Sequence, residues 1–228
     1  MENLPEDLIP LLFNLLSEKS KASVLVLAYV SKPCYRLVSR YARMNNLNRR
    51  FKSYEVAAEG SLNILKWIKS IGYHLDDLTC DYAAKNGHLG VLKFARSCGS
   101  YWSARTCSLA ASNGHLDVLK WARSNGCEWD LWTCASAALN GHLEVLRWAH
   151  KNGCVWDDRI CANASENGHL EVLKWAIKHH CPWDVRVYIN AIDNKHLHIF
   201  MWLVINKMPS NQFVLRLAHE TWPQLFEL

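Results

Sequence analysis

Cysteine and histidine are the residue types in this sequence that could bind a metal, form disulfides or supply a nucleophile and a base. Nine cysteines occur among 228 residues, and seven of them recur at two fixed positions of a repeated pattern. These are Cys80, Cys107, Cys134 and Cys161 at one position, and Cys127, Cys154 and Cys181 at the other. The nearest spacing is C-x6-C, between Cys127 and Cys134, whereas structural zinc sites use close pairs such as C-x-x-C. We therefore expect reduced thiols that pack as small buried side chains, with no metal.

The histidines also recur with the pattern, each directly after a glycine. They are His88, His115, His142 and His169. We expect them to pack at the start of a helix rather than to bind metal. No glycine-rich phosphate loop follows a strand in the sequence, and carboxylates are paired only at helix-capping positions. The sequence therefore predicts neither a cofactor nor an enzymatic activity.

The positions that differ between copies are candidates for binding. One of them holds Leu78, Arg105, Trp132, Arg159 and Arg186. Arginine and tryptophan are enriched at binding hot spots, so we take Arg105, Trp132, Arg159 and Arg186 as candidate target-binding residues that would favour an acidic partner. The alternative is that the arginine stems only cover the stack while their charges remain in water. A second variable position holds His74, Tyr101, Glu128, Val155 and Pro182.

A repeat of 27 residues must position all of these side chains. Its clearest marker is a glycine, at Gly60, Gly87, Gly114, Gly141 and Gly168, and Lys195 stands where the sixth would fall. A fixed period of this length indicates a stacked array of similar units.

Each copy predicts two helices and no strand. A polar residue that can cap the first helix stands at Asp76, Ser103, Asp130, Asp157 and Asp184. Small residues such as Cys107, Ala110 and Ala111 follow at spacings of three and four, which places them on one helix face. The Asn-Gly pair that ends each copy's first helix allows a left-handed turn.

The second helix carries an apolar stripe, for example Val145, Leu146, Trp148 and Ala149, which we expect to be buried. A further tryptophan follows in each connector. Helix pairs are expected at about 50 to 71, 77 to 98, 104 to 125, 131 to 152, 158 to 179 and 185 to 206, with a final helix from Asn211 to Trp222.

The letters A-A-x-N-G-H-L-E-V-L-K-W resemble the ankyrin repeat, whose two helices carry A-A-x-x-G-H-x-E-V-V-K-L. That family has a longer period, and the residues absent here are those that project as a β-turn finger. The array is most similar to compact, fingerless ankyrin-like arrays of giant DNA viruses, algae and protists. The resemblance covers about residues 50 to 228 and implies a helical-hairpin solenoid that binds proteins.

The first 52 residues differ from the rest in charge. They hold nine Lys or Arg and four Asp or Glu, whereas the remainder holds 17 of each. The segments Leu-Pro-Glu-Asp-Leu-Ile, from residue 4, and Val-Ser-Lys-Pro-Cys-Tyr-Arg-Leu, from residue 30, resemble the F-box. That family carries Leu-Pro-x-Glu-(Leu/Ile)-Leu and Val-Ser-(Lys/Arg)-x-(Trp/Phe)-Arg-x-Leu. The resemblance covers residues 3 to about 44.

The sequence thus predicts an all-α protein with an F-box-like domain at 1–48 and an ankyrin-like array at 49–228, closed by a capping helix. By resemblance, the F-box would dock on the Skp-type linker of a cullin–RING ubiquitin ligase through Leu4, Pro5, Leu8, Ile9 and Leu12. The repeats would hold the protein to be ubiquitinated. The alternative is a plain interaction scaffold whose N-terminal helices only cap the stack.

Other partners and places are constrained by composition. A basic segment without interleaved aromatic residues is a poor footprint for nucleic acid. No apolar run reaches 18 residues, and no signal-peptide pattern opens the sequence, so no membrane segment is expected. We expect a monomer in the cytoplasm, which would be the host's if the source is a virus, with the nucleus left open.

Overall fold

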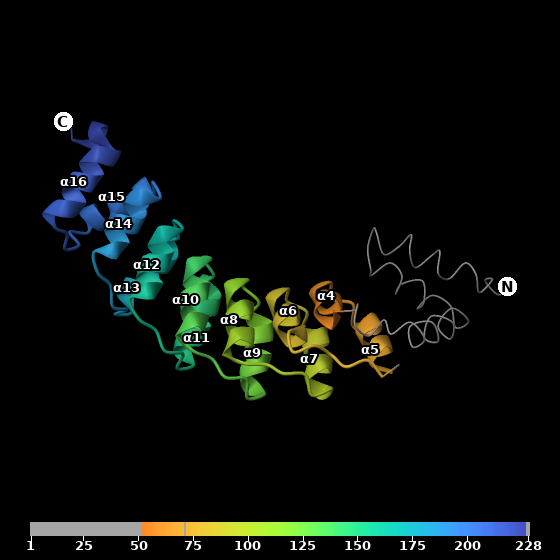
Figure 1. Ribbon diagram of the computed structural model, residues 1–228. Coiled ribbons are helices and arrows are strands. Elements are labelled where there is room, and N and C mark those ends of the chain that lie inside the picture. Colours follow the sequence, from red (N-terminus) through yellow and green to blue (C-terminus); the bar gives the residue numbers. More distant parts are fainter. Residues whose placement is uncertain (1–51, 71, 227–228) are drawn as a thin grey trace, which may run out of the picture. The chain divides into compact units, whose positions relative to one another are not determined.

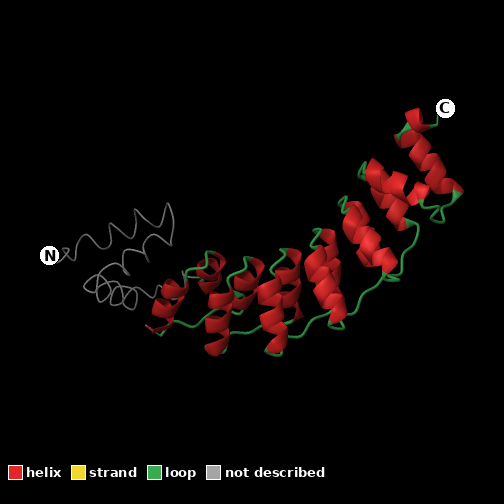
Figure 2. Ribbon diagram, turned by 180° about the vertical axis from the view of Figure 1, so that it is seen from behind, coloured by secondary structure: helices red, strands yellow, loops and turns green. Residues whose placement is uncertain are grey.

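The computed structural model describes residues 52–70 and 72–226, which form helices joined by short connectors (Figure 1). Within those ranges the chain contains no strand (Figure 2). Residues 1–51, with the F-box-like segment and its candidate linker-binding residues, lie outside the described residues. The chain divides into two compact units, one ending at Trp102 and one beginning at Ser103.

The described part of the first unit consists of two helical hairpins. They are α4 (Ser53–Ala58) with α5 (Leu62–Ser70), and α6 (Thr79–Lys85) with α7 (Leu89–Ser97). The first helices of the two hairpins, α4 and α6, pack against each other. Both hairpins fall where the repeat predicts them.

The second unit continues the same pattern with four hairpins and a final helix. They are α8 (Ala104–Ser112) with α9 (Leu116–Ser124), α10 (Leu131–Leu139) with α11 (Leu143–Lys151), α12 (Arg159–Glu166) with α13 (Leu170–Lys178), α14 (Arg186–Asp193) with α15 (Leu197–Ile205), and α16 (Gln212–Thr221), followed by the 3-10 helix η2 (Pro223–Leu225). Asn211 caps α16, because its Oδ1 accepts a hydrogen bond from the Val214 amide at 3.0 Å. The predicted helix pairs and final helix are confirmed.

Small buried side chains allow the first helices of successive hairpins to approach closely. In α10, Cys134, Ala137 and Ala138 are fully buried. Helices α8, α10, α12, α14 and α16 each pack on the next in this series. The second helices bury a stripe such as Val145 and Leu146 against their own hairpin.

The tryptophans of the second helices do not lie in the buried stripe, and this expectation is wrong. Trp121, Trp148 and Trp175 are all half-exposed. They stand at the edge of the stripe, where each can pack on a connector tryptophan. Trp148 meets Trp129 edge to face, with ring centroids 5.7 Å apart, and Trp156 meets Trp175 in the same way at 5.6 Å. The tryptophan pairs therefore cover the connectors instead of filling the core.

Within each unit, the recurring histidine joins a hairpin to the preceding one through a hydrogen bond. In the second unit, the His142 Nε2–H donates to the Ser112 carbonyl at 3.1 Å, at the end of the preceding first helix. The same ring lies so close to Gly114 that a Cβ there would stand 2.8 Å from His142 Nδ1. Gly114 is also left-handed, with φ of 76°. The glycine is thus required both for its conformation and for the room it leaves.

The same histidine contact explains why the sixth glycine position can hold a lysine. Lys195 keeps the left-handed conformation, with φ of 59°. Its predecessor Gly168 lies under the ring of His196, whereas Pro223 stands where the next histidine of the repeat would fall. A side chain is therefore tolerated at the position where the histidine series ends.

The five predicted capping residues act in different ways. Asp130 caps α10 as expected, with its Oδ1 accepting from the Trp132 amide at 3.0 Å, and Ser103 caps α8. Asp76 does not cap α6, which begins at Thr79. Its carboxylate instead accepts from the Ser53 hydroxyl at 2.9 Å and from the Ser53 amide. The prediction is wrong there because the amide at the start of α4 competes for the same carboxylate.

Candidate functional site

The four candidate target-binding residues lie in the first turns of four successive first helices of the second unit. Arg105 is on α8, Trp132 on α10, Arg159 on α12 and Arg186 on α14. We call these four residues the first-turn row. Their common place follows from the repeat, since the four residues are spaced by 27 and each helix begins at or one residue before them.

The structure extends this position by one residue that the sequence reasoning missed. Phe213 follows Arg186 by one repeat period and lies in the first turn of α16, where 57% of its surface is exposed. The signal was present in the period itself. It was missed because the last copy departs from the other letters of the repeat.

Trp132 and Arg159 are brought into direct contact. The guanidinium carbon of Arg159 lies 4.8 Å from the centroid of the Trp132 ring, a cation–π arrangement. Trp132 nevertheless remains 53% exposed. The arginine therefore holds one large aromatic side chain in place at the surface while most of its area stays accessible to a partner.

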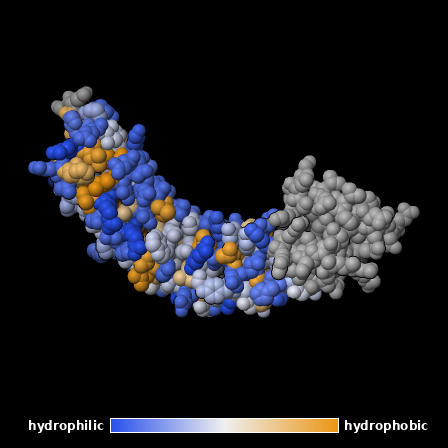
Figure 3. Space-filling view, viewed as in Figure 1, coloured by the Kyte–Doolittle hydropathy of each residue, from blue (hydrophilic) through white to orange (hydrophobic). Residues whose placement is uncertain are grey.

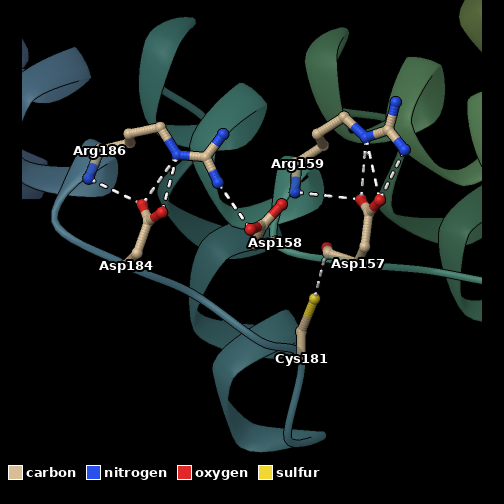
Figure 4. A network of polar contacts seen from close by, with 6 residues as sticks. All are labelled: Asp157, Asp158, Arg159, Cys181, Asp184 and Arg186. Atoms are coloured by element: carbon tan, nitrogen blue, oxygen red, sulfur yellow. Dashed lines mark hydrogen bonds and ion pairs between the residues drawn. The ribbon is translucent and has the colours of Figure 1, made fainter.

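Carboxylates hold both C-terminal arginines of the row (Figure 4). Arg159 Nη2 lies 2.6 Å from Asp157 Oδ2, and its Nε lies 2.9 Å from the same oxygen. Arg186 Nη2 lies 2.6 Å from Asp158 Oδ2, while its Nε lies 2.8 Å from Asp184 Oδ2. Such paired contacts fix the plane of a guanidinium group.

The ion pairs also change the electrostatics of the row. The hydrogen bond from Arg159 lowers the pKa of Asp157, which therefore stays ionised. The hydrogen bonds that the two arginines donate to aspartates raise the pKa values of both, with Asp157 as the main partner of Arg159 and Asp184 of Arg186. Because Arg159 and Arg186 already face carboxylates, these two arginines give no support to the expected preference for an acidic partner.

The cysteines and histidines form no candidate metal centre in the described ranges. There, no group of three or more His, Cys, Asp or Glu side chains is placed to hold an ion. All eight described cysteines are outside disulfides, and those at both repeat positions are buried. They act as core residues at these positions.

Further apolar side chains gather at the C-terminal end of the second unit, where the space-filling view shows hydrophobic surface (Figure 3). Val204 and Ile205 on α15 are 46% and 70% exposed. In the hairpin before, Lys178 stands at the position of Ile205. Sequence reasoning noted that this copy drifts but did not single out these residues. The sequence did indicate them, because Ile205 replaces a charged residue at a solvent-exposed position of the repeat.

The second variable position lies in the connectors and is exposed throughout the described chain. Tyr101, in the first unit, is 62% exposed, and Val155, in the second, is 67% exposed. The side chains there differ in size and charge from one connector to the next. This position therefore remains a second candidate for binding.

The described helices are all short, and none is long and apolar enough to cross a bilayer.

Comparison with known proteins identifies the fold. No family model matches the chain, and no curated protein matches it either. Among solved structures, the crystal structure of the human ASB11 ankyrin repeat domain matches with a TM-score of 0.57 at 15% sequence identity, covering 70% of this chain and 85% of that chain. The chain therefore has the fold of an ankyrin-like array of helix pairs, as expected from its repeat.

Proposed function

We propose that the array is a protein-interaction module, without catalytic activity, that binds a target protein through the first-turn row. The observation that supports this most directly is Trp132, which is 53% exposed and held from one side by Arg159. An exposed tryptophan lowers solubility and adds nothing to the core. It is the residue type that most often carries binding energy at a protein interface.

The two arginines that ion pairs already hold in place support the same proposal. Arg159 and Arg186 lose little side-chain entropy on binding, because carboxylates already fix them. Their guanidinium planes can still stack or donate further hydrogen bonds. The row is thus a set of large, ordered side chains on the first turns of neighbouring helices.

The more specific proposal is that the protein is a substrate-recruiting adaptor of a cullin–RING ubiquitin ligase. It rests on the F-box-like letters of residues 4 to 9 and 30 to 37, and on the array that follows almost at once at Ser53. In this role the N-terminal segment docks on a Skp-type linker while the array holds the target. The adaptor brings two proteins together and does no chemistry itself.

The test of the binding row compares two quadruple variants by affinity purification and quantitative mass spectrometry. One replaces Arg105, Trp132, Arg159 and Arg186 with alanine. The matched control replaces four exposed second-helix residues, Lys120, Arg147, Lys151 and Lys178, with alanine. We expect unchanged helical circular dichroism in both, and loss of captured proteins only for the first. Equal capture by both variants would move the site elsewhere, first to the connector position.

The test of the adaptor role uses Leu8→Asp combined with Leu12→Asp. If these leucines dock on the linker, the variant should lose affinity for a purified Skp-type linker by roughly thirtyfold, since a large interface anchor contributes about 2 kcal/mol or more. Its melting temperature should hardly change. No linker binding by the unmodified chain, together with a large drop in melting temperature in the variant, would instead leave the capped scaffold.

A further inference from the structure

Three buried thiol pairs recur along the second unit. In each pair, a cysteine near the start of a first helix interacts with the cysteine of the connector that follows the same hairpin, and this interaction raises the pKa of the first-helix cysteine. The pairs are Cys107 with Cys127, Cys134 with Cys154, and Cys161 with Cys181. We call them the thiol pairs.

Each connector thiol makes a second contact that fixes its position. The Sγ of Cys127 donates to the Ser103 carbonyl at 3.3 Å, that of Cys154 to the Asp130 carbonyl at 3.5 Å, and that of Cys181 to the Asp157 carbonyl at 3.3 Å. These carbonyls precede the first helix of the same hairpin. The connector sulfur of each pair is therefore held against the backbone at the start of its own hairpin, as Figure 4 shows for Cys181 and Asp157.

We propose that the three thiol pairs are modification sites that close to disulfides in exchange with a small disulfide such as oxidised glutathione. Each connector Sγ lies against the carbonyl four residues, one helical turn, before its partner cysteine, so the two thiols are neighbours that a disulfide could join. This proposal is independent of the proposed binding function, because it concerns buried thiols, none of which belongs to the first-turn row.

In the pairs of Cys154 and Cys181, the connector cysteine is the group that reacts first. Cys154 and Cys181 retain 4% and 3% exposure, whereas Cys134 and Cys161 are fully buried. The hydrogen bond from Cys134 also lowers the pKa of Cys154, which favours its thiolate, whereas the pKa of Cys134 is raised. Opening of the short connector would expose Cys154 without unfolding the helices.

The exchange proceeds in two balanced steps. The Cys154 thiolate attacks one sulfur of oxidised glutathione, forming a mixed disulfide and releasing one glutathione thiolate. The Cys134 thiolate then attacks the Cys154 sulfur, forms the intramolecular disulfide and releases the second glutathione thiolate. The two thiol protons end on the two released glutathiones. The protein dithiol is oxidised and one glutathione disulfide is reduced.

Two other hairpins lack one or both of these cysteines and serve as internal controls for the reaction. In the first unit Ser100 stands at the connector position of Cys127, so the hairpin of Cys80 has only one of the two sulfurs. There the Cys80 Sγ donates to the Ser100 carbonyl at 3.8 Å. In the last hairpin the two positions hold Tyr188 and Met208, and the Tyr188 hydroxyl donates to the Met208 carbonyl at 2.9 Å. We expect neither hairpin to form a bridge.

The experiment incubates the folded, full-length protein with glutathione at set ratios of its reduced and oxidised forms. Remaining thiols are then alkylated, and the protein is digested with trypsin without reduction. Two linked species are expected, one joining residues 106–120, 124–147 and 152–159, and the other joining 160–174 and 179–186. Each bridge should lower the unfolding equilibrium constant on the order of a hundredfold.

Two variants test the pairing itself. Ser100→Cys should add a fourth bridge, between positions 80 and 100. Cys154→Ser should remove the link to residues 152–159 and leave the pair of Cys161 and Cys181 unchanged. The proposal is overturned if the folded protein forms no bridge at any ratio, if bridges form only in denaturant, or if they join other cysteines, such as the two within 124–147.

Discussion

Gly141 and Gly153 flank the same helix and share one backbone conformation, with φ of 74° and 80°, but their surroundings differ. A Cβ at Gly141 would stand 2.6 Å from His169 Nδ1, whereas at Gly153 nothing lies within 4 Å. The left-handed conformation favours glycine at both positions. The histidine of the next hairpin adds a second requirement at Gly141 alone.

We therefore predict that Gly141→Ala destabilises the protein more than Gly153→Ala. The second change should cost about 1 to 2 kcal/mol for the left-handed conformation. The first should cost about 1 to 3 kcal/mol more, because the added methyl displaces a packed ring. Urea unfolding measures both. In a His169→Ala background the two costs should become similar, and a difference that persists there would contradict this explanation.

His150 replaces an arginine of the repeat. In the preceding copies the guanidinium carbons of Arg96 and Arg123 lie 4.2 Å from connector tryptophan rings. His150 stacks on Trp156 in the corresponding place, with centroids 3.8 Å apart. Burial, and then the nearby His179, lower the pKa of His150. The folded state therefore favours the neutral ring where the other copies carry a permanent cation.

The pH dependence follows from the sign of that shift. As the pH falls below the usual histidine value of 6.5, the unfolded chain takes up the proton first, so the free energy of unfolding decreases. We predict that His150→Arg reduces this loss between about pH 7.5 and about pH 5.5. It should also add about 0.5 to 1 kcal/mol at the higher pH through the cation–π contact. Urea unfolding at both pH values tests this.

A residual loss should remain in the variant, because burial also lowers the pKa of His169. His179→Gln offers a control, since it removes the neighbouring imidazole ring but keeps His150. An identical pH dependence in the unmodified protein and in His150→Arg would show that His150 does not contribute.

At the scale of the element, the second helices span nine residues each, for example α11 (Leu143–Lys151). Isolated helices of this length are marginal in water, so tertiary packing must stabilise them. Their buried stripe supplies part of this packing. The tryptophan pairs at the edge, such as Trp129 with Trp148, supply more by joining the helix to the connector.

Trp148→Ala should accordingly cost about 2 to 3 kcal/mol, less than the 3 to 5 kcal/mol typical of a fully buried tryptophan. Lys151→Ala, on the exposed side of the same helix, should cost less than about 0.5 kcal/mol. Thermal and urea unfolding of both variants measure these costs. Equal losses would mean that the helix faces are wrongly assigned.

The repeated sequence pattern predicts the helices well, because helix-ending glycines and the periodicity of apolar residues act locally. The start of α6 could not be predicted from local sequence, because the Asp76 carboxylate accepts a hydrogen bond from Ser53 of a different hairpin and does not cap α6. Trp148 was misplaced because it adjoins the buried stripe in the helical pattern. The first-turn row was proposed from the variation between copies of the repeat. Its ion pairs could not be predicted, because they depend on side-chain rotamers that the spacing of residues in the sequence does not determine.

At the scale of the whole molecule, the repeated histidine contact between hairpins predicts that complete periods can be removed. Deleting residues 131–157 joins Asp130 to Asp158 and brings His169 to the place of His142, over Gly114. We predict a folded, cooperatively unfolding protein. Circular dichroism and urea unfolding measure helical content and cooperativity.

The control for this deletion removes only residues 131–142, which contain α10 and its turn. It takes away fewer residues but leaves α11 without the helix it packs on. For each residue removed, we expect this deletion to lose more helical content than deletion of the complete period. The opposite order would show that the 27-residue unit is not the unit of stability.

The ion pairs of Arg159 and Arg186 in Figure 4 bear on the rate at which a target protein would associate with the first-turn row. Long-range attraction speeds association only when a surface carries unbalanced charge. Arg159 and Arg186 face carboxylates, so a target approaching this part of the row meets little net field. Binding should then begin by unsteered diffusion, at about 10⁵ to 10⁶ M⁻¹s⁻¹, and change little with added salt. Selectivity among targets would be expressed in how long each one stays bound.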